Sequence, residues 1–147
     1  MLRSVLAVIA GYLAMFVLIF LAFTCAYQVL GAGWAFKPGS FEASNRWLAI
    51  AFVVNFVVAI IGGLICAMIA KGGKAPFALA ILVFVLGFVF AIPDLVSRNA
   101  TTNMIRAGDV PMLEAMQKAK QPVWAPLLFP FIGAAGVLIG GRLKRRS

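Results

Sequence analysis

The residues that most often carry catalysis or bind metals are scarce in this sequence of 147 residues. It has no histidine, which removes the commonest general base near neutral pH and the commonest ligand for zinc, copper and haem. The two cysteines, Cys25 and Cys66, form no CxxC pair, so thioredoxin-like redox chemistry has no support. The acidic residues are only four: Glu42, Asp94, Asp109 and Glu114. Because these groups assemble no reactive set, we predict a protein that is not an enzyme and has no metal or cofactor.

The amino-acid composition indicates the class of protein that contains these few polar groups. Hydrophobic residues make up 64% of the chain and charged residues 12%, against about 25% charged in an average soluble domain. Mean hydropathy is +1.06. One soluble domain of this size could not bury so much apolar surface, and disordered chains are poor in apolar residues. The composition therefore indicates an integral membrane protein.

Four apolar stretches are long enough to cross about 30 Å of hydrocarbon as helices. They cover approximately residues 4–27, 47–70, 76–96 and 122–141. None alternates as a membrane β-strand must. The first follows Arg3 and is too long for a signal-peptide core, so we interpret it as an uncleaved helix. The sequence thus predicts a single all-α transmembrane domain over 1–147, an integral membrane four-helix bundle.

The flanking charges predict the orientation of the spans. Net side-chain charge is +7 on the side of the two termini, where the cations are Arg3, Lys71, Lys74, Arg142, Lys144, Arg145 and Arg146. It is +2 on the other side, where all four acids accompany Lys37, Arg46, Arg98, Arg106, Lys118 and Lys120. We expect both termini in the cytoplasm (N-in/C-in) of a multi-pass protein of the bacterial inner membrane.

The basic tail dominates the high isoelectric point of about 10.4. In a soluble protein this value would suggest nucleic acid, but here the charge lies at helix ends, where anionic headgroups are the natural partner. We expect membrane lipids and no nucleic acid as partners. The predicted headgroup contacts are Arg142, Lys144, Arg145 and Arg146. The tail serves as a topology anchor or as a specific lipid or protein docking site.

Aromatic residues are expected at the outer membrane surface. Trp34 lies in the first outer loop, Trp47 begins the second span and Trp124 begins the fourth, as an interfacial aromatic belt predicts. An aromatic ligand-binding cluster is the alternative. Within the same loop, Lys37–Ser40 has the Pro and Gly positions of a type II turn.

The second outer loop, 97–121, is long enough to hold a short amphipathic helix over about 110–120. Asp109 suits its N-cap and Pro111 its first turn, and Glu114 with Lys118 forms a favourable i, i+4 pair. The expected apolar face is Met112, Leu113, Met116 and Ala119. We expect this helix to lie at the outer interface or cap the bundle; a partner-binding helix remains open.

Small residues predict where the spans pack, because in lipid they let helix backbones approach closely. The second span repeats them in steps of four around one polar side chain: Ala51, Asn55, Ala59, Gly63 and Ala67. Gly136 and Gly140 form a GxxxG motif in the fourth span. Asn55 should hydrogen-bond to another helix, as a structural link or as a ligand or ion contact. Near the end of the third span, Asp94 and Arg98 are spaced for a surface ion pair.

The Gly62-Gly63 pair, the segment Glu114–Trp124 and the basic tail together resemble small four-helix membrane proteins of bacteria that have no assigned activity. The resemblance covers the overall layout and implies no function. We therefore expect a non-catalytic accessory or scaffold subunit that packs against itself or a larger membrane complex. The alternative is a small homo-oligomeric channel or transporter in which Asn55, Tyr12 or Gln28 lines a path. Lipid or pigment binding between the helices is left open.

Overall fold

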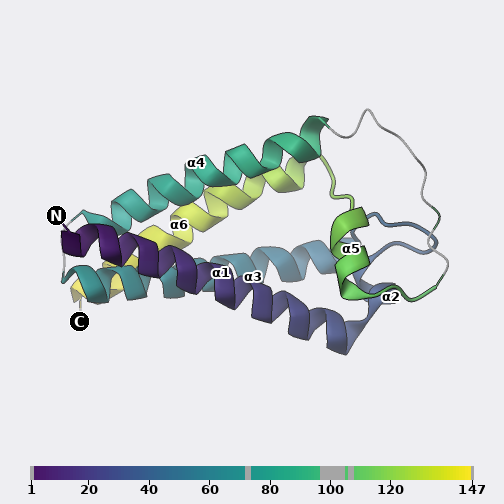
Figure 1. Cartoon of the computed structure of the whole chain (residues 1–147), viewed down its shortest axis with the longest axis horizontal. Coiled ribbons are helices and arrows are strands. Elements are labelled where there is room, and N and C mark those ends of the chain that lie inside the picture. Colours follow the sequence, from purple (N-terminus) through teal and green to yellow (C-terminus); the bar gives the residue numbers. More distant parts are fainter. Residues whose placement is uncertain (1, 72–73, 97–104, 106–107, 147) are drawn as a thin grey trace.

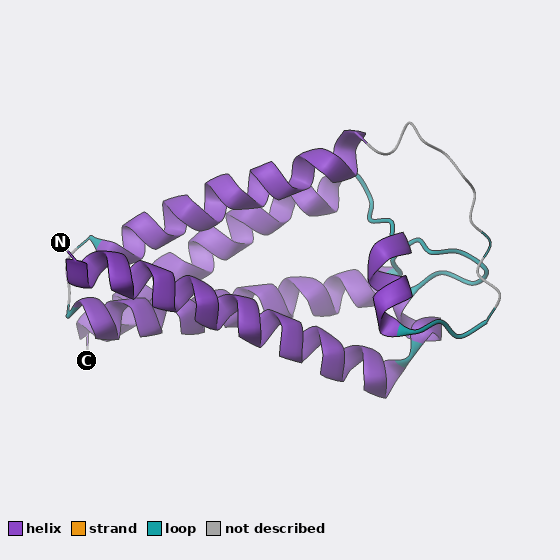
Figure 2. Ribbon diagram, in the orientation of Figure 1, coloured by secondary structure: helices purple, strands orange, loops and turns teal. Residues whose placement is uncertain are grey.

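The computed structural model describes residues 2–71, 74–96, 105 and 108–146, leaving out the side chains of Asp94, Arg145 and Arg146. Its helices are α1 (Leu2–Leu30), α2 (Ala32–Ala35), α3 (Asn45–Ala70), α4 (Ala75–Val96), α5 (Met112–Lys118) and α6 (Trp124–Arg146). The all-helical prediction is confirmed for this part of the chain, where the only β pairings are two isolated bridges (Figure 2). The suggested Asp94–Arg98 ion pair lies outside the described residues.

Four of the described helices, α1, α3, α4 and α6, are long and apolar enough to cross a membrane, as predicted. The two end residues of α3 show why its limits lie where they do. Ser44 is its N-cap, and the Trp47 backbone N–H donates to Ser44 Oγ at 3.1 Å. At the other end Lys71 adopts a left-handed conformation with φ of 52°, which stops the helix before α4.

The four long helices form two pairs that meet at one end of the molecule and separate toward the other (Figure 1). In this view α1 lies beside α3 and α4 lies beside α6, and the most extensive packing in the bundle is that of α3 on α6. Both chain termini lie at the closed end, which we call the terminal end. The opposite end, where the helices diverge, carries α2 and α5 and is called the α5 end.

The segments at the α5 end are tied together by backbone hydrogen bonds. The Ala43 N–H donates to the Lys120 carbonyl at 2.8 Å, and the Lys120 N–H donates to the Phe41 carbonyl at 2.9 Å. The Tyr27 hydroxyl of α1 donates to the Val110 carbonyl at 2.7 Å. The loop before α3 and the segment around α5 therefore form one cap over the diverging helices.

The sequence prediction for α5 was wrong about its first residues and about one residue of its face, Leu113. Pro111, not Asp109, occupies the N-cap position, because its carbonyl accepts the first helical hydrogen bond, from Ala115 N–H at 2.9 Å. Leu113 is 69% exposed, whereas Ala115 is buried. Positions 112, 115, 116 and 119 line the space between α5 and the long helices. Residue 113 does not, because it lies about 100° around the helix from residue 112.

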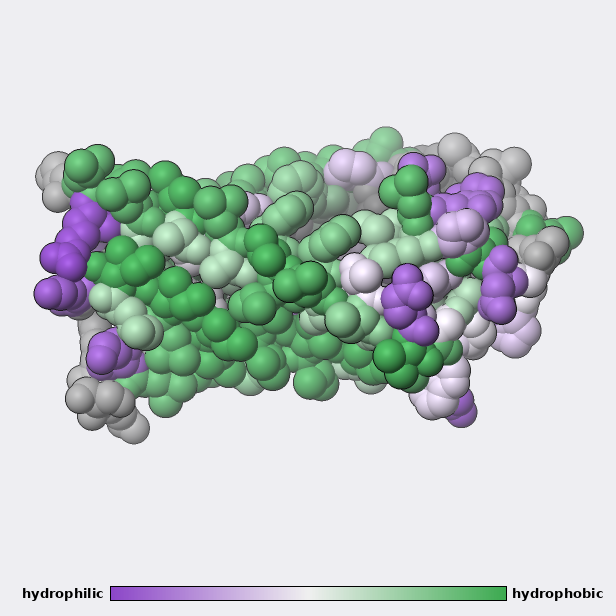
Figure 3. All heavy atoms as spheres, turned by 60° about the horizontal axis from the view of Figure 1, so that its bottom comes forward, coloured by the Kyte–Doolittle hydropathy of each residue, from purple (hydrophilic) through white to green (hydrophobic). Residues whose placement is uncertain are grey.

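The surface between the two ends is a broad apolar band, with hydrophilic side chains gathered at both ends (Figure 3). Large apolar side chains are exposed on all four long helices. The core between these helices consists mostly of small and medium residues, among them Ala7, Ala59, Cys66 and Val137. This combination of an apolar exterior and a small-residue interior is that of a multi-pass membrane protein.

Candidate functional site

The closest helix contact is between α3 and α6. A Cβ atom built on Gly63 would overlap the backbone carbonyl of Val137, and one on Gly140 would overlap that of Ile60. A Cβ on Gly136 would lie 2.6 Å from that of Ala59. Ala67, one turn further along α3, is also buried. The glycines of one helix thus face the backbone of the other, and only residues without a side chain fit there.

A second close contact joins α3 to α1 on a different face. A Cβ on Gly11 would lie 3.0 Å from the Gly62 carbonyl oxygen and 2.9 Å from Leu79 Cδ2. A Cβ on Gly62 would overlap the Met15 side chain. Gly62 and Gly63 are adjacent in the run of small residues on α3. The structure separates their roles, because neighbouring residues point about 100° apart on a helix. Gly62 faces α1, and Gly63 faces α6.

Asn55 links α3 to α6 at mid-length. Its Nδ2 donates to the Phe129 carbonyl oxygen at 3.3 Å, which is the inter-helix hydrogen bond expected from the sequence. Pro130 follows directly and packs against α4, where a Cβ on Gly87 would lie 2.8 Å from Pro130 Cγ. The polar bond and the proline contact together connect α3, α6 and α4 at one level.

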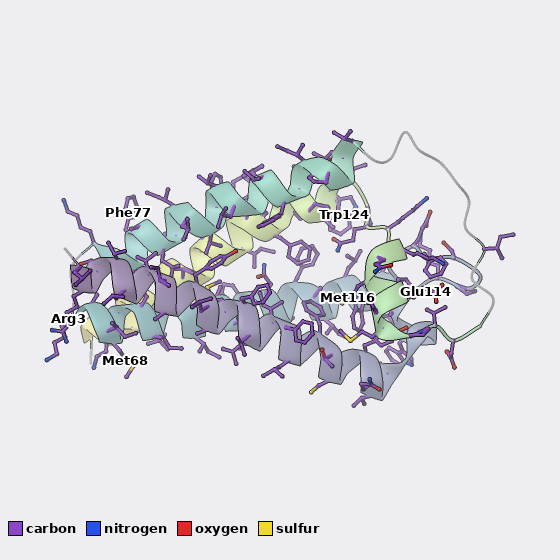
Figure 4. All side chains as sticks on the ribbon, in the orientation of Figure 1. Arg3, Met68, Phe77, Glu114, Met116 and Trp124 are labelled. Carbon is purple, nitrogen blue, oxygen red and sulfur yellow. The ribbon has the colours of Figure 1, made fainter. Side chains whose placement is uncertain are left out.

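All three tryptophans lie at the α5 end, in two kinds of environment. Trp34 and Trp124 are exposed. The Arg46 guanidinium lies 5.0 Å from the centre of the Trp34 ring. Trp124, labelled in Figure 4, stacks on Phe52. Trp47 is half-buried and packs against ring neighbours of α1, with a centroid distance of 5.7 Å to Phe23. Trp47 is therefore part of the helix packing.

One group of basic residues lies at the terminal end, where Figure 4 labels Arg3. Arg142 and Lys144 are exposed there. The side chains of Arg145 and Arg146 lie outside the described residues. Arg3 Nε donates to the Ile69 carbonyl at 2.9 Å, in the last turn of α3. No sequence pattern predicted this contact, in which an arginine satisfies one of the free carbonyls at a helix C-terminus.

Acids and cysteines form no reactive set in the part of the chain that the structure describes, and no group of three or more potential metal ligands occurs there. Glu42 accepts a hydrogen bond from Lys37 at 2.8 Å, and Glu114 accepts one from Lys118 at 2.6 Å. The hydrogen bond and positive charge of Lys37 lower the pKa of the Glu42 carboxyl. Both cysteines are free, Cys66 buried and Cys25 exposed.

Where the helix pairs separate, an apolar groove runs along α1. Its larger part, of about 480 Å³, lies among α1, α2, the start of α3 and α5. Its smaller part, of about 180 Å³, continues toward the middle of the bundle, where Tyr12 and Asn55 line it. Phe16 and Ile19 line both parts, and no charged side chain lines either. We call the two parts together the α1 groove.

Sequence reasoning did not find the α1 groove, although the apolar face of α5 was a partial signal. Met112, Met116 and Ala119, three of the four residues expected on that face, line it. The other lining residues come from α1, α2, α3, α4 and α6 and from the loops next to α3 and α6, and no local pattern predicts that these segments enclose a common space. Comparison with protein-family models, curated proteins and solved structures found no match.

Proposed function

We propose that this chain is a non-catalytic accessory or scaffold subunit of the bacterial inner membrane, with both termini in the cytoplasm. Charge supports this orientation: Arg3, Lys71, Lys74, Arg142 and Lys144 lie at the terminal end, and all three of the acids whose side chains are described lie at the α5 end. In this arrangement α5 and the tryptophans are at the outer membrane surface.

The observation that carries the scaffold role is the low burial of α1 in its own bundle. Only 17% of the most apolar 18-residue stretch of α1 is buried, against 44% in α6. Its buried positions form one narrow strip: Ala7, Gly11 and Met15. Large side chains such as Leu13 and Val17 are exposed on the remaining circumference. That circumference is available to a helix of a second copy or of another membrane protein.

A photo-crosslinking amino acid at Leu13 tests this role in native membranes. The matched control is the same amino acid at Val53, which is also apolar and is 64% exposed, against 55% for Leu13, but lies on α3. We expect Leu13 to give discrete protein adducts, identified by mass spectrometry after gentle detergent extraction, and Val53 to give none. Equal patterns from the two positions would refute the role of α1 as a docking helix.

The second candidate is a small channel or transporter, and one observation favours it. Tyr12 and Asn55, from α1 and α3, line the same 180 Å³ cavity near the bundle centre. A path needs polar groups from end to end, and here the neighbours are apolar, including Phe90 and Phe129. Conductance of the purified protein in planar bilayers, compared with that of Asn55→Leu, distinguishes this candidate from the scaffold.

A further inference from the structure

The cations at the terminal end form one exposed surface, which we call the basic end. Its described members lie at the ends of the four long helices, and all of their side chains are exposed: Arg3, Lys71, Lys74, Arg142 and Lys144. Hydrophilic side chains border the apolar band there (Figure 3). Charges just outside an apolar band lie at the depth of the lipid phosphates when the band is in a bilayer.

Arg3 is held beside the end of α3. Its Nε donates to the Ile69 carbonyl at 2.9 Å, two residues before Lys71. The guanidinium makes no other hydrogen bond or ion pair with the described residues. Because a guanidinium has five N–H groups in a fixed fork, its Nη1 and Nη2 edge is left for two parallel bonds to a phosphate. Arg3 is therefore positioned in advance for an anion, which a flexible lysine is not.

A second contact brings cations of α6 and α4 to the same place. A Cβ on Gly141 of α6 would lie 2.6 Å from Pro76 Cβ of α4. Arg142 follows Gly141 directly. Lys74 lies two residues before Pro76 and three after Lys71, so the Cα atoms of the two lysines are at most roughly 11 Å apart. The cations of the two helix pairs therefore join into one surface.

No acid neutralises the basic end within the part of the chain that the structure describes. Aspartate and glutamate are absent from the described stretches 2–30, 45–71, 74–93 and 124–146. The ion pairs among described residues, Lys37–Glu42 and Lys118–Glu114, both lie at the α5 end. Like charges gathered at one end repel one another, and an anion bound between them removes that repulsion. The basic end is thus complementary to an anion from outside the chain.

The apolar neighbours of these cations favour a lipid over a soluble anion. Leu2, Phe77 and Leu143 lie within three residues of a cation and are 76%, 59% and 48% exposed. A soluble phosphate would contact the cations and leave these apolar side chains in water. A phospholipid carries its phosphate next to hydrocarbon and covers both. The excess of positive charge favours a lipid with net negative charge over a zwitterionic one.

We propose that the basic end binds the phosphate of an anionic phospholipid from the membrane leaflet at the terminal end, with Arg3 as the fixed contact and Lys71, Lys74 and Arg142 around it. The proposal rests on the insertion of this chain in a membrane, as proposed above, and is independent of the docking of α1 onto a partner. It places the centre of lipid binding at the helix ends near Arg3, whereas the sequence pointed to the basic tail alone.

Native mass spectrometry of the full-length protein, released from a neutral detergent, tests the proposal. The protein is titrated with phosphatidylglycerol or with phosphatidylcholine of the same acyl chains, and we expect phosphatidylglycerol to bind more tightly. Arg3→Gln should weaken its binding roughly fivefold, equivalent to about 1 kcal/mol, the contribution of one cation near anionic lipid. Arg3→Lys should weaken it less, because the charge is kept and only the fork is lost.

Arg46→Gln is the matched control and should leave the affinity for phosphatidylglycerol unchanged. Like Arg3, Arg46 is exposed and is the second residue of a membrane-spanning helix. It lies at the α5 end, however, over the ring of Trp34. If Arg3→Gln does not fold, Lys74→Gln replaces it, since the Lys74 side chain makes no hydrogen bond or ion pair with the described residues.

Each further outcome identifies which idea fails. Equal binding of the two lipids, or equal weakening by Arg3→Gln and Arg46→Gln, would overturn the anionic-lipid site. Displacement of phosphatidylglycerol by millimolar inorganic phosphate would assign the basic end to a soluble anion and refute the lipid. Flotation with phosphatidylcholine vesicles tests insertion separately: a protein that stays at the bottom of the density gradient is not inserted, and one that floats without preferring either lipid refutes only the site.

Discussion

Adding a single methyl group at Gly63 should destabilise the protein measurably. In Gly63→Ala the new Cβ would lie 2.9 Å from Val137 Cα and closer still to its carbonyl oxygen, whereas ordinary contact begins at 3.4 Å. The atoms in the way are backbone, so no rotamer change relieves the overlap. The overlap with Val137 Cα alone requires α6 to move away from α3 by about 0.5 Å, and the closer carbonyl oxygen requires a larger movement.

The size of the effect follows from that displacement. A gap of about 0.5–1 Å forfeits roughly a quarter to a half of the dispersion energy between the atoms that it separates. Overpacking of this kind costs about 1–3 kcal/mol. At about 2–4 °C per kcal/mol for a chain of this length, the melting temperature should fall by about 2–12 °C.

Thermal unfolding in mild detergent, followed by far-UV circular dichroism and size exclusion, measures this change. Gly33→Ala is the matched control, because no atom lies within 4 Å of a Cβ at that position. We expect the control to melt with the wild type. Equal melting temperatures for Gly63→Ala and Gly33→Ala would refute the close contact. The double variant Gly63→Ala/Gly140→Ala should lose less stability than the sum of the losses in the two single variants, since one movement of α6 relieves both overlaps.

Three further predictions concern Asn55, the membrane topology and Glu42. Asn55→Leu should lower the free energy of unfolding in detergent by about 0.6 kcal/mol, the average for an inter-helix hydrogen bond in a membrane protein. An unchanged free energy of unfolding, measured by chemical denaturation, would contradict this prediction. Cysteines introduced at Ser40 and Ser147 should be labelled from opposite sides of sealed vesicles, and labelling of both from one side would refute the topology. Because Glu42 has a lowered pKa, its ion pair stabilises the cap above the ordinary value of 4.5 and is lost as pH falls through the lowered pKa. This loss of stability at low pH should be small, since both side chains are exposed, and it should be absent in Glu42→Gln. If the stability of the variant and of the wild type falls equally at low pH, the prediction is wrong.

The spans and their small-residue contacts were predictable because both depend on local sequence. A run of apolar residues determines a membrane-spanning helix, and a step of four puts Ala59, Gly63 and Ala67 on one face. The GxxxG motif likewise placed Gly136 and Gly140 on one face of the last helix, at positions that do contact α3.

Features that depend on how helices are oriented relative to one another were not predictable in this way. The step-of-four pattern did not show that Gly62 belongs to a separate contact, because both glycines extend the same run of small residues. The α1 groove lies between α1 and residues of several other helices, and no residue pattern within any one of these helices specifies how they are oriented relative to one another. The start of α5 was also misplaced, since Asp109 and Pro111 are both acceptable near a helix start and tertiary context decides between them.

The two adjacent glycines of α3 have a consequence for biogenesis. Chain order places α1 and α3 in the membrane first. Their contact through Gly11 and Gly62 involves only these two helices, and the Leu79 side chain of α4 packs beside Gly11 later. The first hairpin can therefore assemble while the ribosome is still translating the second half. The Gly63 face stays vacant on the finished hairpin until α6, the last helix to emerge, arrives. Synthesis order and packing order coincide in this chain, and α3 is the template on which the final helix docks.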